Sequence, residues 1–128
     1  MDKFAILSSG SSGNCLFIEY KGSKILVDAG FSARRIENLL KEVGKDANEL
    51  DAIFLTHEHA DHTKGAGTLS RRYNIPIFAN GGTWKGIEKS VGKIKDENIK
   101  VFDSSKFLSF GSMDIMPVKV HHDANEPV

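Results

Sequence analysis

The chain has 128 residues, with 17 basic and 17 acidic side chains and a formal net charge of zero, which excludes a strongly cationic domain. No apolar stretch approaches the roughly twenty residues of a membrane span or the minimum of about seven in a signal peptide, so no membrane association is expected. The single cysteine, Cys15, excludes an internal disulfide, and the cytoplasm is the expected compartment.

Three strands are predicted in the first part of the chain, at residues 3–7, 15–20 and 24–29. Because they follow one another at short spacing, we expect them to form an antiparallel meander. A helix is predicted over residues 32–44, where apolar residues recur at helical spacing after Ser32, a suitable N-cap.

The rest of the chain alternates strands and helices. A continuously apolar strand at 52–57 indicates burial on both faces. The elements expected after it are a helix from about 63 to 73, a strand at 75–80, a helix at 83–92 and strands at 99–102, 106–110 and 113–120. Gly86 weakens the second helix, and Pro117 favours an edge or a bulge for the last strand. The pattern predicts one α+β domain over residues 1–128, built around one sheet.

The stretch LTHEHADHTKG, residues 55–65, holds three of the five histidines of the chain. In an extended chain His57 and His59 project to the same side, and Asp61 and His62 follow on the expected turn into a helix. Two imidazoles then face one point, and a carboxylate with an imidazole faces a neighbouring point. Such donors suit zinc, iron or manganese, and two ions about 3.5–4 Å apart can clamp an in-line displacement at phosphorus or a carbonyl.

Other interpretations of these residues are weaker. Solvated histidines at a helix start would not explain so many donors at this spacing, and the zinc motif with two histidines four residues apart is absent. Glu58 alternates away from the histidine pair and is interpreted as a solvated or helix-start acid. Cys15 opens a strand and is expected to be a small core residue rather than a nucleophile.

Sequence motifs resemble those of one known family. THEHADH resembles the His-x-His-x-Asp-His signature of the metallo-β-lactamase superfamily, and ILVDAG resembles an earlier strand of that family. SSGSSGNC and HHDANEP are similar to its YycJ/WalJ-type (VicX-type) branch. The resemblance implies the N-terminal half of a four-layer αββα sandwich, with one mixed sheet and helices on one face.

This resemblance also implies an activity. The full-length form is expected to be a metal-dependent hydrolase, specifically a phosphodiesterase or DNA exonuclease with DNA as its partner. Hydrolysis of RNA, a thioester or a lactam on the same fold is the alternative within enzymes. A non-catalytic metal-binding or oligomerising fragment is the alternative for the isolated chain.

Family likeness also assigns roles to individual residues. His57 and His59 become ligands of a first metal, while Asp61 and His62 become ligands of a second, and Asp61 is in addition the catalytic residue. The next ligand of this branch is a histidine followed by Asp-Ala, which corresponds to His122.

Three residues are assigned supporting roles by the same likeness. Asp28, at the end of the earlier strand, would orient ligands. His121 would orient ligands or face the substrate, although spacing alone does not choose between His121 and His122 as the ligand. Asp123 either orients a histidine or caps the following turn.

The family's second half supplies a bridging aspartate and a final histidine that have no counterpart up to Val128. We therefore expect two divalent ions in the full-length form, zinc first with manganese or iron as alternatives, and one or none in this chain. A single sheet without its opposing layer would expose an apolar face, which predicts a homodimer.

Overall fold

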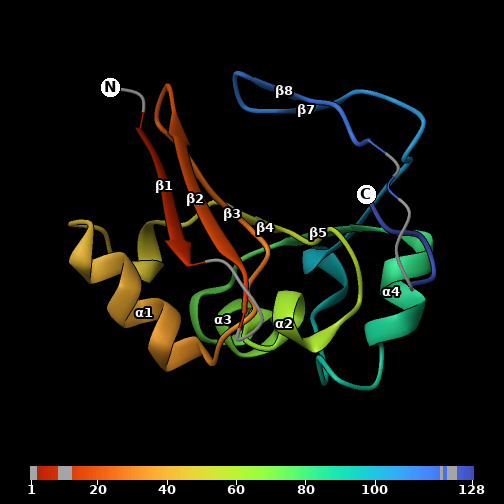
Figure 1. Cartoon of the computed structure of the whole chain (residues 1–128), viewed down its shortest axis with the longest axis horizontal. Coiled ribbons are helices and arrows are strands. Elements are labelled where there is room, and N and C mark those ends of the chain that lie inside the picture. Colours follow the sequence, from red (N-terminus) through yellow and green to blue (C-terminus); the bar gives the residue numbers. More distant parts are fainter. Residues whose placement is uncertain (1–2, 9–12, 119, 121–123) are drawn as a thin grey trace.

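The computed structural model describes residues 3–8, 13–118, 120 and 124–128 (Figure 1). His121, His122 and Asp123 therefore lie outside the described residues. The strands are β1 (Lys3–Ser8), β2 (Cys15–Tyr20), β3 (Ser23–Val27), β4 (Ala52–Phe54), β5 (Ile77–Asn80), β6 (Ile99–Phe102), β7 (Leu108–Phe110) and β8 (Met113–Ile115). The helices are α1 (Ala33–Glu42), α2 (Ala60–Thr63), α3 (Ala66–Tyr73) and α4 (Gly81–Ile87), with single-turn helices η1 (Ala47–Glu49) and η2 (Asp96–Asn98).

Six strands form one mixed sheet in the order β1-β2-β3-β4-β5-β6. β1, β2 and β3 pair antiparallel, which confirms the predicted meander, and β3 to β6 pair parallel. Because parallel strands run in one direction, the carboxyl ends of β3, β4 and β5 meet at the same edge of the sheet. His57 follows β4 and so lies at that edge.

The helices cover one face of this sheet (Figure 1). α1 begins where predicted, because the Ser32 hydroxyl accepts a hydrogen bond from the Arg35 N–H at 3.3 Å. Its apolar face buries Ile36 and Leu40 in one core cluster with residues such as Leu26 and Ile53 of the sheet. None of the helices in the described ranges has the length and apolar character needed to cross a bilayer.

The helix predicted from about residue 63 to 73 is α3, which ends at Tyr73 as predicted and begins three residues later than expected, directly after Gly65. The Gly65 N–H donates to the carbonyl of Ala29 at 2.8 Å, and a Cβ at this position would lie 2.3 Å from the carbonyl oxygen of Phe31. Gly65 thus allows a close approach to the loop after β3 at the start of α3. The later start of the helix was not predicted because local periodicity does not report such a long-range contact.

The last two predicted strands do not join this mixed sheet, contrary to the expectation of one sheet for the whole chain. β7 and β8 form a separate hairpin with Phe110 opposite Met113, and β8 ends at Ile115, well short of the predicted residue 120. Pro117 carries no backbone N–H, so the chain beyond β8 has lost a donor that a continued strand would need.

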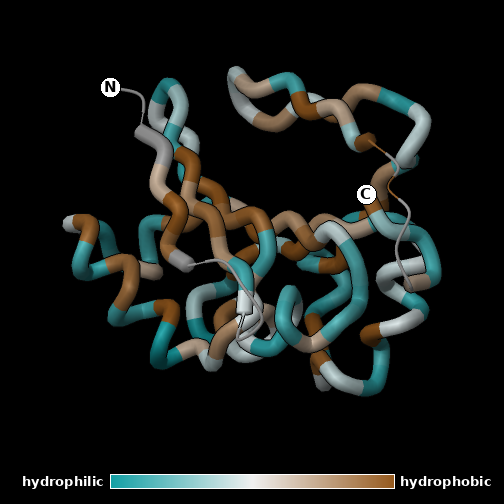
Figure 2. Tube along the Cα trace, in the orientation of Figure 1, coloured by the Kyte–Doolittle hydropathy of each residue, from teal (hydrophilic) through white to brown (hydrophobic). Residues whose placement is uncertain are grey.

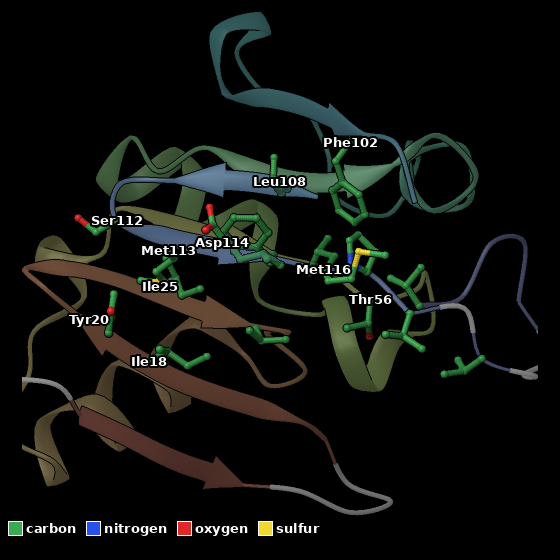
Figure 3. A pocket seen from close by; sticks show the side chains of 18 residues that line it. Ile18, Tyr20, Ile25, Thr56, Phe102, Leu108, Ser112, Met113, Asp114 and Met116 are labelled. Atoms are coloured by element: carbon green, nitrogen blue, oxygen red, sulfur yellow. The ribbon is translucent and has the colours of Figure 1, made fainter. Parts of the chain in front are cut away.

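The hairpin packs over the sheet face opposite the helices, which corrects the expectation that this face has no partner within the chain. Phe54 and Phe78 stack with ring centroids 4.6 Å apart, and Phe110 meets both rings edge-on. The cover is partial, because a cavity of about 720 Å³ remains between hairpin and sheet (Figure 3). Ile25, Met113 and Met116 are among its lining residues, and Figure 2 shows hydrophobic residues along the strands beneath it.

Truncation of Phe110 should test whether the hairpin is anchored by its aromatic ring. Phe110→Ala removes the edge-on contacts with Phe54 and Phe78, so it should lower the free energy of unfolding by about 2 kcal/mol, less than for a fully buried ring. Phe107 is 71% exposed and serves as the matched control. Phe107→Ala should change the free energy of unfolding by no more than about 0.5 kcal/mol. Urea denaturation measures both, and equal losses would show that the ring does not anchor the hairpin.

Candidate metal centre

The carboxylate of Asp28 joins β3, β4 and the histidine-rich turn. Asp28 follows β3 with a left-handed backbone (φ 66°), a conformation that aspartate tolerates better than most residues, and its N–H donates to the carbonyl of Phe54 at 2.7 Å. The buried carboxylate accepts hydrogen bonds from the backbone N–H and the hydroxyl of Thr56, both at 2.8 Å. Its Oδ2 also lies 2.6 Å from Nδ1 of His62.

These contacts determine which nitrogen of two histidines carries the proton. The hydroxyl of Thr56 gives its only hydrogen to Asp28, so its oxygen accepts from Nδ1–H of His57 at 3.1 Å. Nδ1–H of His62 donates directly to Asp28. The hydrogen-bond network therefore leaves Nε2 of both rings with a lone pair, the form in which a histidine binds a metal.

His62 lies between Asp28 and Asp61. Its Nε2 is 3.1 Å from the side-chain nitrogen of Asn14 and 3.6 Å from Oδ2 of Asp61. Burial lowers the pKa of His62, but the hydrogen bond and charge of Asp28, together with the charge of Asp61, raise the pKa by more, so it lies above its ordinary value. A metal at Nε2 would therefore compete with a proton.

Three of the predicted ligands converge. The donor atoms of His57, His59 and Asp61 all lie within 4.8 Å of one another, against about 3.4 Å between neighbouring ligands of a tetrahedral zinc ion. His57 is 6% exposed. The centroid of its ring lies 5.0 Å from the ring centroid of His59 and 3.8 Å from the ring centroid of His62. Two imidazoles and a carboxylate at this spacing fit a divalent metal ion after modest side-chain rotation.

Two residues that sequence reasoning did not single out hold the turn in place. Asn14 donates its backbone N–H to the carbonyl of Asp61 at 2.8 Å, and its own carbonyl accepts from Gly30 at 2.9 Å. A Cβ on Gly30 would lie 1.8 Å from the carbonyl oxygen of Asp61, so only glycine fits there. Thr56 is the other residue that the sequence analysis did not identify, although its position between a buried strand and His57 could have indicated its role. The end of the SSGSSGN segment thus lies beside the motif.

The last residues of the chain also attach to this edge of the sheet. The Val128 N–H donates to the carbonyl of Thr56 at 3.0 Å, and the Val120 N–H donates to the carbonyl of Pro127 at 3.3 Å. The C-terminal end of the chain is therefore attached to Thr56, the residue before His57, and Val120 is attached to that end.

Of the two interpretations of Glu58, the solvated acid was wrong, whereas the residue does lie just before a helix, α2. Its side chain is half-buried and accepts a hydrogen bond from the Asn125 N–H at 2.8 Å. A Cβ on Gly86 of α4 would lie 2.6 Å from Cγ of Glu58, so the glycine that weakened the helix prediction leaves room for this side chain. The expectation for Cys15 is confirmed, because it is 2% exposed. Burial, with a smaller effect of the Asp28 charge, raises its pKa to about 12, so the thiol is not a nucleophile at neutral pH.

Comparison with known proteins agrees with this architecture. Exodeoxyribonuclease WalJ of Streptococcus pneumoniae is 43% identical over 127 residues, which cover 98% of this chain and 47% of that protein. Exodeoxyribonuclease YycJ of Bacillus anthracis is 39% identical over 125 residues, with the same coverage. This chain thus spans about half the length of these relatives.

Solved structures show the same fold. The metallo-beta-lactamase SMB-1, crystallised with mercaptoacetic acid, superposes with a TM-score of 0.72 at 13% identity, over 89% of this chain and 49% of its own. The mixed sheet with helices on one face is therefore half of that fold, as predicted. The family model of the metallo-beta-lactamase superfamily matches residues 9–125. The chain belongs to the metallo-beta-lactamase superfamily.

Proposed function

We propose that this chain is the metal-binding half of a hydrolase that acts on phosphodiesters and, in its full-length form, degrades DNA from its ends. The observation that carries the proposal is the convergence of His57, His59 and Asp61 in a chain 39–43% identical to two proteins named exodeoxyribonucleases. An RNA, thioester or lactam substrate is the alternative for the full-length form, and metal binding without catalysis is the alternative for the isolated chain.

His57, His59 and His122 are proposed to hold a first ion, and Asp61 and His62 a second. Support for His122 comes from its neighbours, since it lies three residues before Asn125, a reach of at most about 11 Å between their Cα atoms. Zinc suits these donors best, with manganese or iron as alternatives. Two ions would be bound in the full-length form and one or none in this chain. A bound ion would supply a Lewis acid that polarises the scissile phosphodiester and lowers the pKa of water.

The residues of the chain orient the reaction around that site. Thr56 fixes the ring of His57 and Asp28 fixes the ring of His62, each through Nδ1, which keeps Nε2 of both rings available. Asp61 keeps its carboxylate partly exposed, where it can accept a hydrogen bond from the attacking water and hold it in line with the phosphorus.

Removal of one imidazole should weaken metal binding. After zinc loading and dialysis, metal analysis should find a bound ion in the wild-type chain and none in His59→Ala. The zinc affinity of His59→Ala should be at least about 100-fold lower than that of the wild type, because the variant lacks a ligand rather than a supporting group. Zinc content unchanged by His59→Ala would refute the ligand assignment.

Activity should depend on Asp61. In the metal-loaded full-length form, Asp61→Ala should lower DNA degradation by at least about 100-fold, because both a ligand and the group that holds water are lost, while the circular dichroism spectrum stays native. Asp96 is an exposed carboxylate on η2, and Asp96→Ala should retain full activity. A protein that cleaves RNA, a thioester or a lactam but not DNA would contradict the proposed substrate.

Self-association of the 128-residue chain is part of the same proposal. Met116, Val118 and Val120 line the cavity beside the hairpin and are 50%, 65% and 48% exposed, so the partial cover leaves apolar surface in water. A second copy packed by two-fold symmetry would bury it. Sedimentation velocity at micromolar concentration should report a dimer, and a monomer that unfolds cooperatively would contradict this expectation.

A further inference from the structure

The side chain of Asn14 lies against the two residues proposed to bind a second ion, yet the chemistry proposed above does not use it. Its amide nitrogen is 3.1 Å from Nε2 of His62 and 3.4 Å from Oδ2 of Asp61. The same nitrogen is 3.4 Å from the backbone carbonyl oxygen of Asp61. Nε2 of His62 and Oδ2 of Asp61 are themselves 3.6 Å apart, so the amide of Asn14 faces both donor atoms at once.

The neighbours of this amide determine which of its two ends faces them. The carboxylate and carbonyl oxygens of Asp61 accept hydrogen bonds and cannot donate one. Nε2 of His62 also accepts, because the ring keeps its proton on Nδ1 for Asp28. All of these neighbours are acceptors, so the atom of Asn14 that faces them is the NH2 group, which has two donors.

An NH2 group in this place uses the electrons that an ion would need. The single lone pair of Nε2 in His62 can bond to one partner, either an N–H or a metal ion. The nitrogen of an amide only donates hydrogen bonds, so Asn14 cannot bind a metal through that atom. A second ion at His62 therefore requires the amide of Asn14 to turn away.

The backbone of Asn14 is held while its side chain has room to rotate. Its N–H donates to the carbonyl of Asp61 at 2.8 Å, and its carbonyl accepts from the Gly30 N–H at 2.9 Å. The side chain is half-buried, so a change of rotamer can bring the amide into solvent without moving the backbone. Asn14 can therefore leave Nε2 of His62 while the turn keeps its shape.

We propose that Asn14 controls binding of the second ion, because its amide occupies the place beside Asp61 and His62 when no ion is bound there. The inference rests on the proposed function, in particular on Asp61 and His62 as ligands of a second ion. The first ion would bind beside His57 and His59 without using Nε2 of His62. Binding of the second ion would break the hydrogen bonds of the amide, which lowers the affinity for that ion.

Zinc titration of the isotope-labelled chain, followed by NMR spectroscopy, tests this order of binding. A constant, mildly alkaline pH keeps protons from competing with the ion. The Nε2 resonances of His57 and His59 should shift in a first phase. Nε2 of His62 and the side-chain NH2 group of Asn14 should shift together at higher zinc concentration. A metal-binding shift of His62 in the first phase would overturn the proposal.

Two substitutions of Asn14 test the competition itself. Asn14→Ala removes the competing donors, so the zinc concentration at the midpoint of the second phase should fall by about 3- to 10-fold, the equilibrium effect of one net hydrogen bond. Asn14→Asp places an oxygen ligand there instead and should lower this midpoint further. If the wild type shows no second phase, both variants should show one. Asn38 is exposed on α1, and Asn38→Ala should leave both phases unchanged.

The melting temperature of the metal-free chain separates competition from a purely structural role. Asn14→Ala loses hydrogen bonds, so it should melt a few degrees below the wild type while it binds the second ion more tightly. A residue that only supports the turn would lower stability and zinc affinity together. A second phase of Asn14→Ala that is weaker than in the wild type, or unchanged, would therefore overturn the proposal.

His57→Ala distinguishes this inference from the metal centre itself. If His57→Ala abolishes the first phase while neither variant of Asn14 changes the second, the role of Asn14 is wrong and the proposed centre stands. If zinc shifts no histidine resonance of the wild type or of the Asn14 variants, the proposed centre is wrong as well.

Discussion

The buried carboxylate of Asp28 is the interaction on which the rest of the site depends. A buried carboxylate is stable only when donors surround it, and Asp28 has three, from the backbone and hydroxyl of Thr56 and from the ring of His62. Thr56 lies in the loop that follows β4, and His62 lies in the short helix α2 directly after that loop. Satisfying one charge at the end of β3 therefore fixes the position and orientation of that loop.

A chain of proton assignments follows from the same carboxylate. Because Thr56 donates its hydroxyl hydrogen to Asp28, it can only accept from His57, and His62 donates to Asp28 directly. Both rings then carry their proton on Nδ1. The electrostatics of one buried residue thus prepare two imidazoles for a cation. Gly30 allows the backbone of Asp61 to approach closely, so that the Asp61 carboxylate can join these imidazoles as a ligand.

Local sequence patterns predicted the elements with strong internal periodicity and the motif with dense donors. Helix α1, the antiparallel meander and the buried strand before His57 all depend on residues close in sequence, as does the presence of metal-binding donors in the turn after that strand. The prediction paired Asp61 with His62, whereas the structure groups the carboxylate of Asp61 with His57 and His59. The later start of α3 after Gly65, the separate β7–β8 hairpin and the roles of Asn14 and Thr56 depend on contacts across long sequence separations. Alternation along a strand predicted that Glu58 points away from the histidine pair as a solvated or helix-start acid, but the chain has already left β4 at that residue, so a period of two no longer applies.

The most direct test of the metal centre is X-ray absorption spectroscopy of the zinc-loaded chain. If Asp28 prepares His57 and His62 for a cation, the zinc should show nitrogen and oxygen neighbours at about 2.0 Å with outer scattering from at least two imidazole rings. A shell of oxygen atoms alone, or a sulfur neighbour from Cys15, would show that zinc binds elsewhere and would contradict the assignment of these histidines.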